Sequence, residues 1–152
     1  AQRVNLRLWS TLDALTPALA VFMIALGAAH YASGAAFGAP TNLPWAVPLW
    51  GETRHPSQIY EMLAAAVILA LLWPGKERLK APQPGDFFLH FIALSSMARL
   101  FLEAWRGDSV LLPGGLRAVQ VIAWLALAIC LWLWHKRHLK PGSGTAAENT
   151  PA

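Results

Sequence analysis

The chain has 152 residues, of which 56% are hydrophobic and 13% are charged, whereas an average soluble domain has about 45–50% and about 25%. A soluble chain of this length needs more charge to coat its surface, so the composition argues against a free-standing cytosolic domain. The net charge of +4 does not indicate nucleic acid, because Lys and Arg form short clusters between apolar runs. The single cysteine, Cys130, leaves no disulfide framework and no Cys-based metal site.

Four segments are apolar enough to cross a hydrocarbon core about 30 Å thick, which needs roughly 20 helical residues. They are residues 12–31, 58–73, 87–105 and 118–134. The second and fourth are slightly short, and we expect their polar and aromatic ends to extend them into the interface. The pattern predicts an all-α, polytopic membrane helical bundle with an interfacial loop between the first two spans. We expect one membrane domain at residues 1–140 and a disordered tail at residues 141–152, which are small, polar and unpatterned.

The basic residues predict the orientation, because Lys and Arg are retained on the cytoplasmic side of a membrane. Eight of them lie before the first span, between the second and third, or after the fourth. Arg54, Arg106 and Arg117 fall on the other side, and Arg99 lies within the third span. Both termini are therefore expected in the cytoplasm.

The third span contains ionisable side chains, each of which costs at least about 2.5 kcal/mol at the bilayer centre and so marks a candidate functional site. At 100° per residue, Ser95, Arg99, Glu103 and Arg106 fall on one helix face. The spacing allows Glu103 to pair with both arginines. Two interpretations stay open: a structural ion-pair ladder, or a cationic site for an anionic headgroup in which Glu103 orients the guanidinium groups.

A dense polar run, RHPSQIYE at residues 54–61, precedes the second span. Pro56 suits the first turn of a helix, and the Ser57 hydroxyl or the Gln58 amide is expected to satisfy free backbone N–H groups there. The run is longer than capping requires, and a helix N-terminus also attracts phosphate.

The predicted topology brings these polar groups together, because the first three spans all have an end on the outer side. We therefore expect a cluster near the outer leaflet that consists of Arg54, His55, Glu61, Arg99, Glu103, Arg106 and His30. A small transporter is an alternative use of such a stripe. It requires polar residues through the whole membrane thickness, and residues 62–73 contain none, so we rank it last.

Four motifs, LDALTPA at 12–18, GAPTNLPW at 38–45, RHPSQIYE at 54–61 and RLFLEAWRGD at 99–108, resemble the prolipoprotein diacylglyceryl transferase family in order and spacing. The resemblance covers roughly residues 9–134 and corresponds to the last four spans of these inner-membrane enzymes. It implies transfer of diacylglyceryl from phosphatidylglycerol to the thiol of a lipobox Cys in a precursor protein, in the bacterial cytoplasmic (inner) membrane. The implied partners are phosphatidylglycerol, the precursor and membrane lipids, with no nucleic acid, no metal and no cofactor.

Carried over by position, the resemblance implies catalytic roles for Arg99, His55, Glu103 and His30. It implies substrate binding by Arg54, Ser57, Gln58, Tyr60, Glu61, Arg106 and Gly38. Guanidinium groups stabilise the charge on a departing glycerol phosphate, and a thiol of pKa about 8.5 benefits from a nearby base.

The chain departs from the family pattern at three positions. The family's Arg and Asn fall on Gly27 and His30, and its Glu falls on Ala35, so His30 is a candidate base where the family uses Asn. These departures keep an alternative open, in which the chain is a catalytically lapsed relative that binds anionic lipid or a protein in the membrane.

Overall fold

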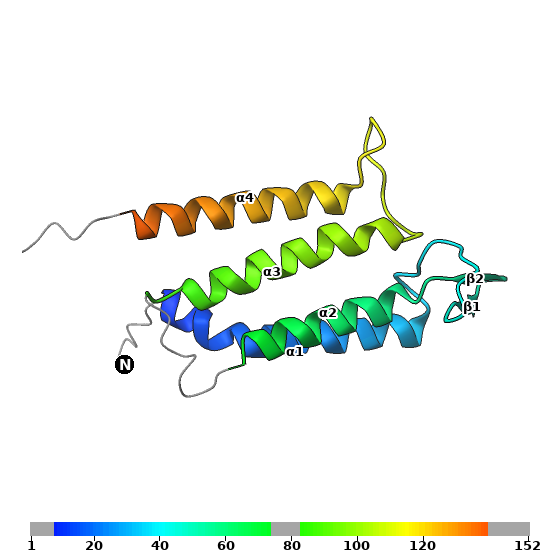
Figure 1. Ribbon diagram of the computed structural model, residues 1–152, viewed down its shortest axis with the longest axis horizontal. Helices are drawn as coiled ribbons and strands as arrows, with labels where there is room; N and C mark the ends of the chain where they lie inside the picture. Colours follow the sequence, from blue (N-terminus) through cyan, green and yellow to red (C-terminus); the bar gives the residue numbers. More distant parts are fainter. Residues whose placement is uncertain (1–7, 74–82, 140–152) are drawn as a thin grey trace, which may run out of the picture.

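The computed structural model describes residues 8–73 and 83–139, so the predicted tail lies outside the described residues. The elements in chain order are α1 (Leu8–Ser33), β1 (Val47–Leu49), β2 (Glu52–Arg54), α2 (Ser57–Leu71), α3 (Asp86–Leu102), the 3-10 turn η1 (Glu103–Trp105) and α4 (Ala118–His138). The four helices lie side by side along one axis (Figure 1). Three helical stretches in the described residues, α1, α3 with η1, and α4, are long and apolar enough to cross a membrane. The prediction of an all-α membrane bundle is confirmed.

The second predicted span forms a helix that is shorter than a membrane crossing needs. The 15 residues of α2 extend about 22 Å at 1.5 Å per residue, against a hydrocarbon core of about 30 Å. The helix begins directly after Pro56 and ends at Leu71, two residues before the predicted end. It packs along α1, as α4 packs along α3, so the bundle consists of two helix pairs.

The start of α2 corrects one prediction, because neither Ser57 nor Gln58 satisfies the free N–H groups of this helix end. The helix has no side-chain cap. Instead the Ser57 hydroxyl donates to the Ala36 carbonyl at 2.7 Å, and the Gln58 amide donates to the Ala35 carbonyl at 2.8 Å. Both side chains are buried, and the loop carbonyls beside them need donors in a place that water does not reach. These two residues therefore attach the loop between α1 and α2, residues 34–56, to the bundle.

The loop between α1 and α2 contains a β-hairpin that the sequence did not signal. Strands β1 and β2 pair antiparallel, Val47 with Arg54 and Leu49 with Glu52. Trp50 and Gly51 form the turn with φ of 57° and 81°, which is the left-handed geometry of a tight hairpin. Strands of three residues are too short for a readable alternation.

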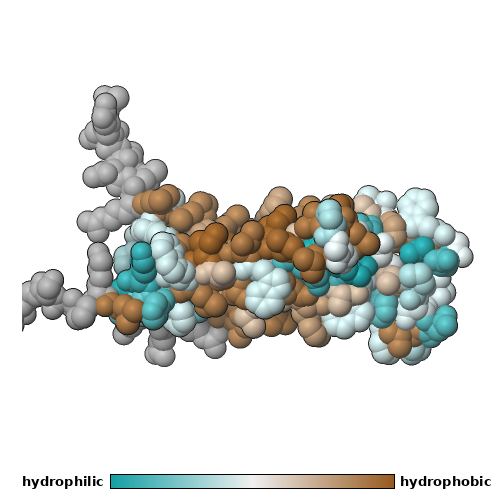
Figure 2. Space-filling model, turned by 90° about the horizontal axis from the view of Figure 1, so that it is seen from above, coloured by the Kyte–Doolittle hydropathy of each residue, from teal (hydrophilic) through white to brown (hydrophobic). Residues whose placement is uncertain are grey.

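The apolar surface of the bundle is typical of a membrane protein. Figure 2 shows hydrophobic residues along the length of the bundle and hydrophilic residues at its two ends. The buried core is small and consists of Ala20, Ile68, Leu72 and Phe91, while large apolar side chains such as Phe22, Leu63 and Ile122 are exposed. Lipid is the solvent that covers such faces.

A polar contact joins the two helix pairs at the end of the bundle where α3 begins. Asp13 of α1 accepts hydrogen bonds from the backbone N–H groups of Gly85, at 2.5 Å, and Phe88, at 2.9 Å. A carboxylate at a helix N-terminus satisfies free donors and complements the helix dipole. The cap is supplied from a different helix, so it also fixes the position of α1 against α3.

Candidate functional site

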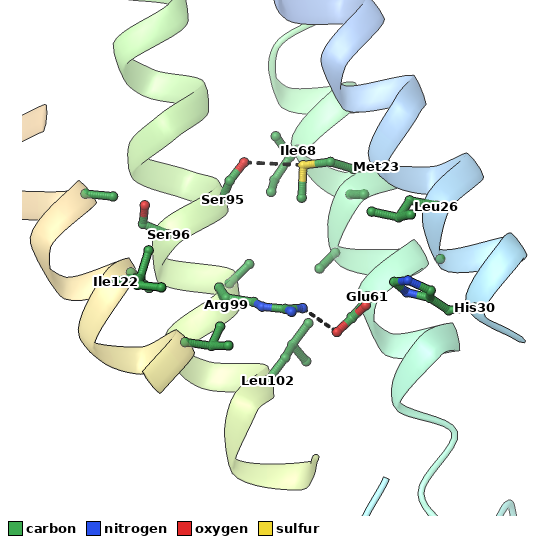
Figure 3. Close-up of a pocket in the computed structure, with 17 residues that line it drawn as sticks. Met23, Leu26, His30, Glu61, Ile68, Ser95, Ser96, Arg99, Leu102 and Ile122 are labelled. Atoms are coloured by element: carbon green, nitrogen blue, oxygen red, sulfur yellow. Dashed lines mark hydrogen bonds and ion pairs between the residues drawn. The ribbon is translucent and has the colours of Figure 1, made fainter. Parts of the chain in front are cut away.

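A cavity of about 380 Å³ lies between the four helices. Most of its lining is apolar and includes Met23, Leu26, Ala65, Ile68 and Ile122. Figure 3 shows the charged groups of the lining together, with Arg99 on α3 directed at Glu61 on α2. Its polar lining residues are His30, Glu61, Ser95, Ser96 and Arg99. The cavity therefore combines an apolar interior with a charged end.

Glu61 is the centre of the charge cluster at that end. Its Oε1 accepts from Arg99 Nη1 at 2.5 Å and from Arg106 Nη1 at 2.8 Å. Glu103, which the helical spacing assigned to both arginines, lies farther away, with its Oε2 at 3.9 Å from each Nε. The predicted ladder is present, but both arginines lie closer to Glu61, on another helix, than to Glu103.

Glu103 lies beneath the two arginines with its side chain fully buried. Its Oε1 accepts from the Ser109 hydroxyl at 2.6 Å, while its Oε2 has no hydrogen-bond partner among the described residues. Arg117 Nη1 donates to the Glu103 carbonyl and, at 3.2 Å, to the Arg106 carbonyl. Arg117 thus brings a positive charge to this buried corner and fixes the backbone on either side of Arg106's position in the cluster.

Asp108 completes the cluster from the loop after η1. Its Oδ1 accepts from Arg106 Nε at 3.0 Å and from Nη2 at 2.8 Å, a forked contact. Burial lowers the pKa of Arg106, but the negative charges of Asp108 and Glu61 outweigh it and raise that pKa above its ordinary value. Arg106 therefore stays cationic at any pH at which the protein is studied.

Sequence reasoning did not identify Asp108, Ser109 or Arg117 as members of this site. Ser109 and Arg117 lie beyond the motif of residues 99–108. Asp108 is the last residue of that motif, but the sequence pattern gave it no role. Counting charges gives three guanidinium groups, on Arg99, Arg106 and Arg117, and three carboxylates, on Glu61, Glu103 and Asp108. These formal charges sum to zero, so an anion that bound here would compete with a carboxylate for a guanidinium group.

His30 reaches the same cavity from α1. It lies next to Glu61, on the side away from Arg99 (Figure 3). Its Nδ1 is buried and has no hydrogen-bond partner in the part of the chain that the structure describes. His30 lines the cavity, and a ring nitrogen without a hydrogen-bond partner is able to accept or donate a proton.

Other predicted site residues lie in the loop between α1 and α2 or in the first turn of α2, and they do not line the cavity. His55 Nδ1 is 3.5 Å from the Tyr60 hydroxyl, which also accepts from Trp45 Nε1 at 2.8 Å. Arg54 pairs with Glu52 at 2.6 Å. The described residues contain no group of three or more His, Cys, Asp or Glu side chains placed to hold a metal ion.

Gly38 contributes through its backbone. Its carbonyl accepts from Arg54 Nη1 at 3.4 Å, and the residue forms an antiparallel bridge with Arg106. A Cβ at this position would lie 2.2 Å from the His55 carbonyl oxygen, which leaves no room for any side chain. Gly38 therefore allows the loop between α1 and α2 to pack against the backbone of Arg106.

The sequence is similar to known proteins of one family. The family model described as prolipoprotein diacylglyceryl transferase matches residues 1–136. A phosphatidylglycerol--prolipoprotein diacylglyceryl transferase of Nostoc sp. is 31% identical over 163 residues, which cover 93% of this chain and 56% of that protein. A protein of the same name from Finegoldia magna is 31% identical, with 91% of this chain and 56% of that protein covered.

A third relative with this name, from Wolinella succinogenes, is 30% identical over 88% of this chain and 50% of its own length. The chain thus spans about half the length of the curated relatives it matches. No solved structure matches it. On the family match and these identities, the chain belongs to the prolipoprotein diacylglyceryl transferase family.

Proposed function

We propose that the chain transfers the diacylglyceryl group of phosphatidylglycerol to the thiol of a lipobox cysteine in a lipoprotein precursor. The observation that supports this most directly is the cavity, whose apolar interior ends at two guanidinium groups held by one carboxylate. A glycerophospholipid has the matching layout, with apolar chains below one phosphate. The names of the relatives specify the same lipid and the same acceptor.

In this proposal the lipid headgroup binds at Arg99 and Arg106. Arg99 is the more accessible of the two, with 35% of its side chain exposed against 11% for Arg106, so Arg99 meets the phosphate first. The diacyl chains enter the apolar cavity between the helix pairs and extend into the surrounding bilayer. Arg54, Gly38, His55, Ser57, Gln58 and Tyr60 belong to the outer loop or its attachment, and we assign them to binding of the precursor on that side.

The reaction is a displacement at the glyceryl carbon that bears the phosphate oxygen. The cysteine sulfur forms a C–S bond with this carbon, the C–O bond breaks, and the electron pair leaves with glycerol phosphate. His30 takes the proton of the thiol, since its buried nitrogen is unpaired. Arg99 and Arg106 stabilise the negative charge on the departing phosphate, a contribution that typically changes rates by a factor of about 100 to 1,000 per donor. Glu61 orients both guanidinium groups, and the buried Glu103 adds negative charge 3.9 Å from each Nε.

We place the protein in the bacterial cytoplasmic (inner) membrane with both termini in the cytoplasm and the site at the outer leaflet. The excess of basic residues outside the outer loops supports this orientation. The helix order agrees with it, because the ends of α1 and α3 and the start of α2 lie at the same end of the bundle (Figure 1).

The test supplies membranes that contain the chain with labelled phosphatidylglycerol and a lipobox peptide, and follows label on the peptide cysteine. Transfer is expected, and Arg99→Ala should reduce it at least about 100-fold. His30→Gln should slow transfer and leave lipid binding unchanged. Lys136→Ala, at the opposite end of α4, is the matched control and should transfer normally.

Two results would contradict the proposal. Lipid binding without transfer above empty membranes would favour the lapsed, lipid-binding alternative. Transfer that is unchanged in Arg99→Ala would show that this cavity is not the site of the reaction.

A further inference from the structure

Two loops leave the bundle at the end where the candidate site lies, and they differ in charge, although both expose apolar side chains, such as Trp50 in the β1–β2 hairpin. The β1–β2 hairpin contains Glu52, Thr53 and Arg54 and extends along the bundle axis (Figure 1). Residues 109–117, which we call the apolar hairpin, contain no charge before Arg117. Val110, Leu111 and Leu116 of this hairpin are 67%, 64% and 58% exposed. Clustered exposed apolar side chains of this kind mark an interaction surface.

The apolar hairpin is an ordered element, so the exposure of its side chains is built into the fold. Leu111 and Arg117 form an antiparallel bridge. The Leu112 N–H donates to the Leu116 carbonyl at 2.7 Å, and the Ala118 N–H donates to the Val110 carbonyl at 2.9 Å. Gly114 and Gly115 make the turn with φ of 94° and 80°, a backbone geometry that other residues rarely adopt.

The position of the hairpin identifies the surface that it faces. It joins the end of one candidate membrane span, at Trp105, to the start of another, at Ala118. Figure 1 shows that it leaves the bundle sideways, away from α1 and α2. Trp105 packs edge-on against Phe101, with ring centroids 4.6 Å apart, and Trp at a span end is typical of the membrane interface. A segment that leaves sideways at this level lies in the plane of the bilayer surface.

We propose that the apolar hairpin inserts Val110, Leu111 and Leu116 into the lipid interface of the leaflet that adjoins the candidate site. Its partner is a lipid surface. No charged group has to be desolvated, because the nearest charges, on Asp108 and Arg117, are already paired with Arg106 and with the carbonyls of Glu103 and Arg106. Burial of exposed apolar area in the interface is therefore favourable without a compensating electrostatic cost.

The insertion has a structural consequence for the site. Arg117, at the base of the hairpin, donates to the carbonyl of Arg106, and Ser109 at the other base donates to Glu103. A hairpin held in the interface therefore sets the depth of the guanidinium groups relative to lipid phosphates. The inference itself does not depend on the transferase proposal, because membrane contact can be measured without turnover.

The experiment reads the environment of single labels on the full chain in liposomes of phosphatidylglycerol and phosphatidylcholine. Cys130→Ala removes the native thiol, and an environment-sensitive fluorophore is attached at Leu111→Cys. Glu52→Cys, next to the turn of the β1–β2 hairpin, is the matched control, because Glu52 is also exposed. We expect blue-shifted emission at position 111 and strong quenching by lipids that carry a spin label near the headgroup, with neither effect at position 52.

Each other result would overturn the inference. Equal emission at the two positions would place the apolar hairpin in water. A blue shift without lipid quenching would mean that protein covers it, and a label that responds only to added lipobox peptide would assign the hairpin to the precursor. Val110→Ser with Leu116→Ser should reduce quenching at position 111, and retained helical circular dichroism would show that this variant is folded.

Discussion

Glu61→Gln should lower the stability of the bundle while making its cationic site more available. Glu61 is the carboxylate that both Arg99 and Arg106 contact below 3 Å. Loss of one partner from a buried ion pair costs about 3–5 kcal/mol. We expect about 3 kcal/mol here, because Arg99 is 35% exposed and its charge stays partly solvated. The Gln side chain also keeps one acceptor oxygen.

The same substitution should strengthen the binding of anionic lipid. Glu61 already contacts both guanidinium groups, so a phosphate has to displace it from at least one of them. A hydrogen bond to a charged group contributes about 1.5–3 kcal/mol. The variant removes that competition and gives the site a net charge of +1. A gain of about tenfold in affinity for phosphatidylglycerol follows, since about 1.4 kcal/mol corresponds to tenfold.

Both quantities can be measured on one preparation in detergent micelles. Unfolding by sodium dodecyl sulfate, followed by circular dichroism, gives the stability, and titration with phosphatidylglycerol against phosphatidylcholine gives the affinity. Glu52→Gln is the matched control, because Glu52 pairs with Arg54 at 2.6 Å but is 54% exposed, and such pairs contribute about 0–1 kcal/mol. Equal stability of the two variants, or weaker lipid binding in Glu61→Gln, would refute the competition between Glu61 and phosphate.

Two further substitutions test other parts of the structure. Ala126→Phe fills the cavity that Ala126 lines and should weaken phosphatidylglycerol binding about tenfold or more, whereas Ala128→Phe, on the exposed face of α4, should leave the same titration unchanged. Asp13→Asn removes the charge that caps α3 and should lower stability by about 1–2 kcal/mol in the detergent unfolding assay; no loss there would mean that this contact does not hold the helix pairs together.

The helices were predictable because a bilayer demands long apolar runs, and the boundaries agree within a few residues except at the ends of α1 and α4. The first extends from Leu8 instead of 12, and the last continues to His138 instead of 134. Interfacial residues such as His135 and Lys136 continue a helix without being apolar, so hydropathy does not detect these turns. The short β-hairpin was missed because three-residue strands leave no periodic pattern.

The candidate site was predictable to the level of composition and topology. Helical spacing placed Arg99, Glu103 and Arg106 on one face, and topology brought Glu61 and His30 to the same end. Spacing within one helix cannot show that Glu61, on another helix, contacts Arg99 and Arg106 more closely than Glu103 does. Tertiary contacts of this kind depend on how far two helices slide past each other, which one sequence does not specify.

The scarcity of charge in this chain takes on a structural meaning once the two helix pairs are considered. Lipid tails are as apolar as leucine, so packing between the α1–α2 pair and the α3–α4 pair has little hydrophobic driving force. Besides the small apolar core, the pairs are joined by polar contacts at opposite ends, Asp13 to the start of α3 and Glu61 to Arg99. The cavity lies between them. Of these two contacts, only the one at Glu61 includes a group that an anionic headgroup can take over. If phosphatidylglycerol binds as proposed, we therefore expect its phosphate to loosen the bundle at the charged end of the cavity, while Asp13 keeps the other end closed.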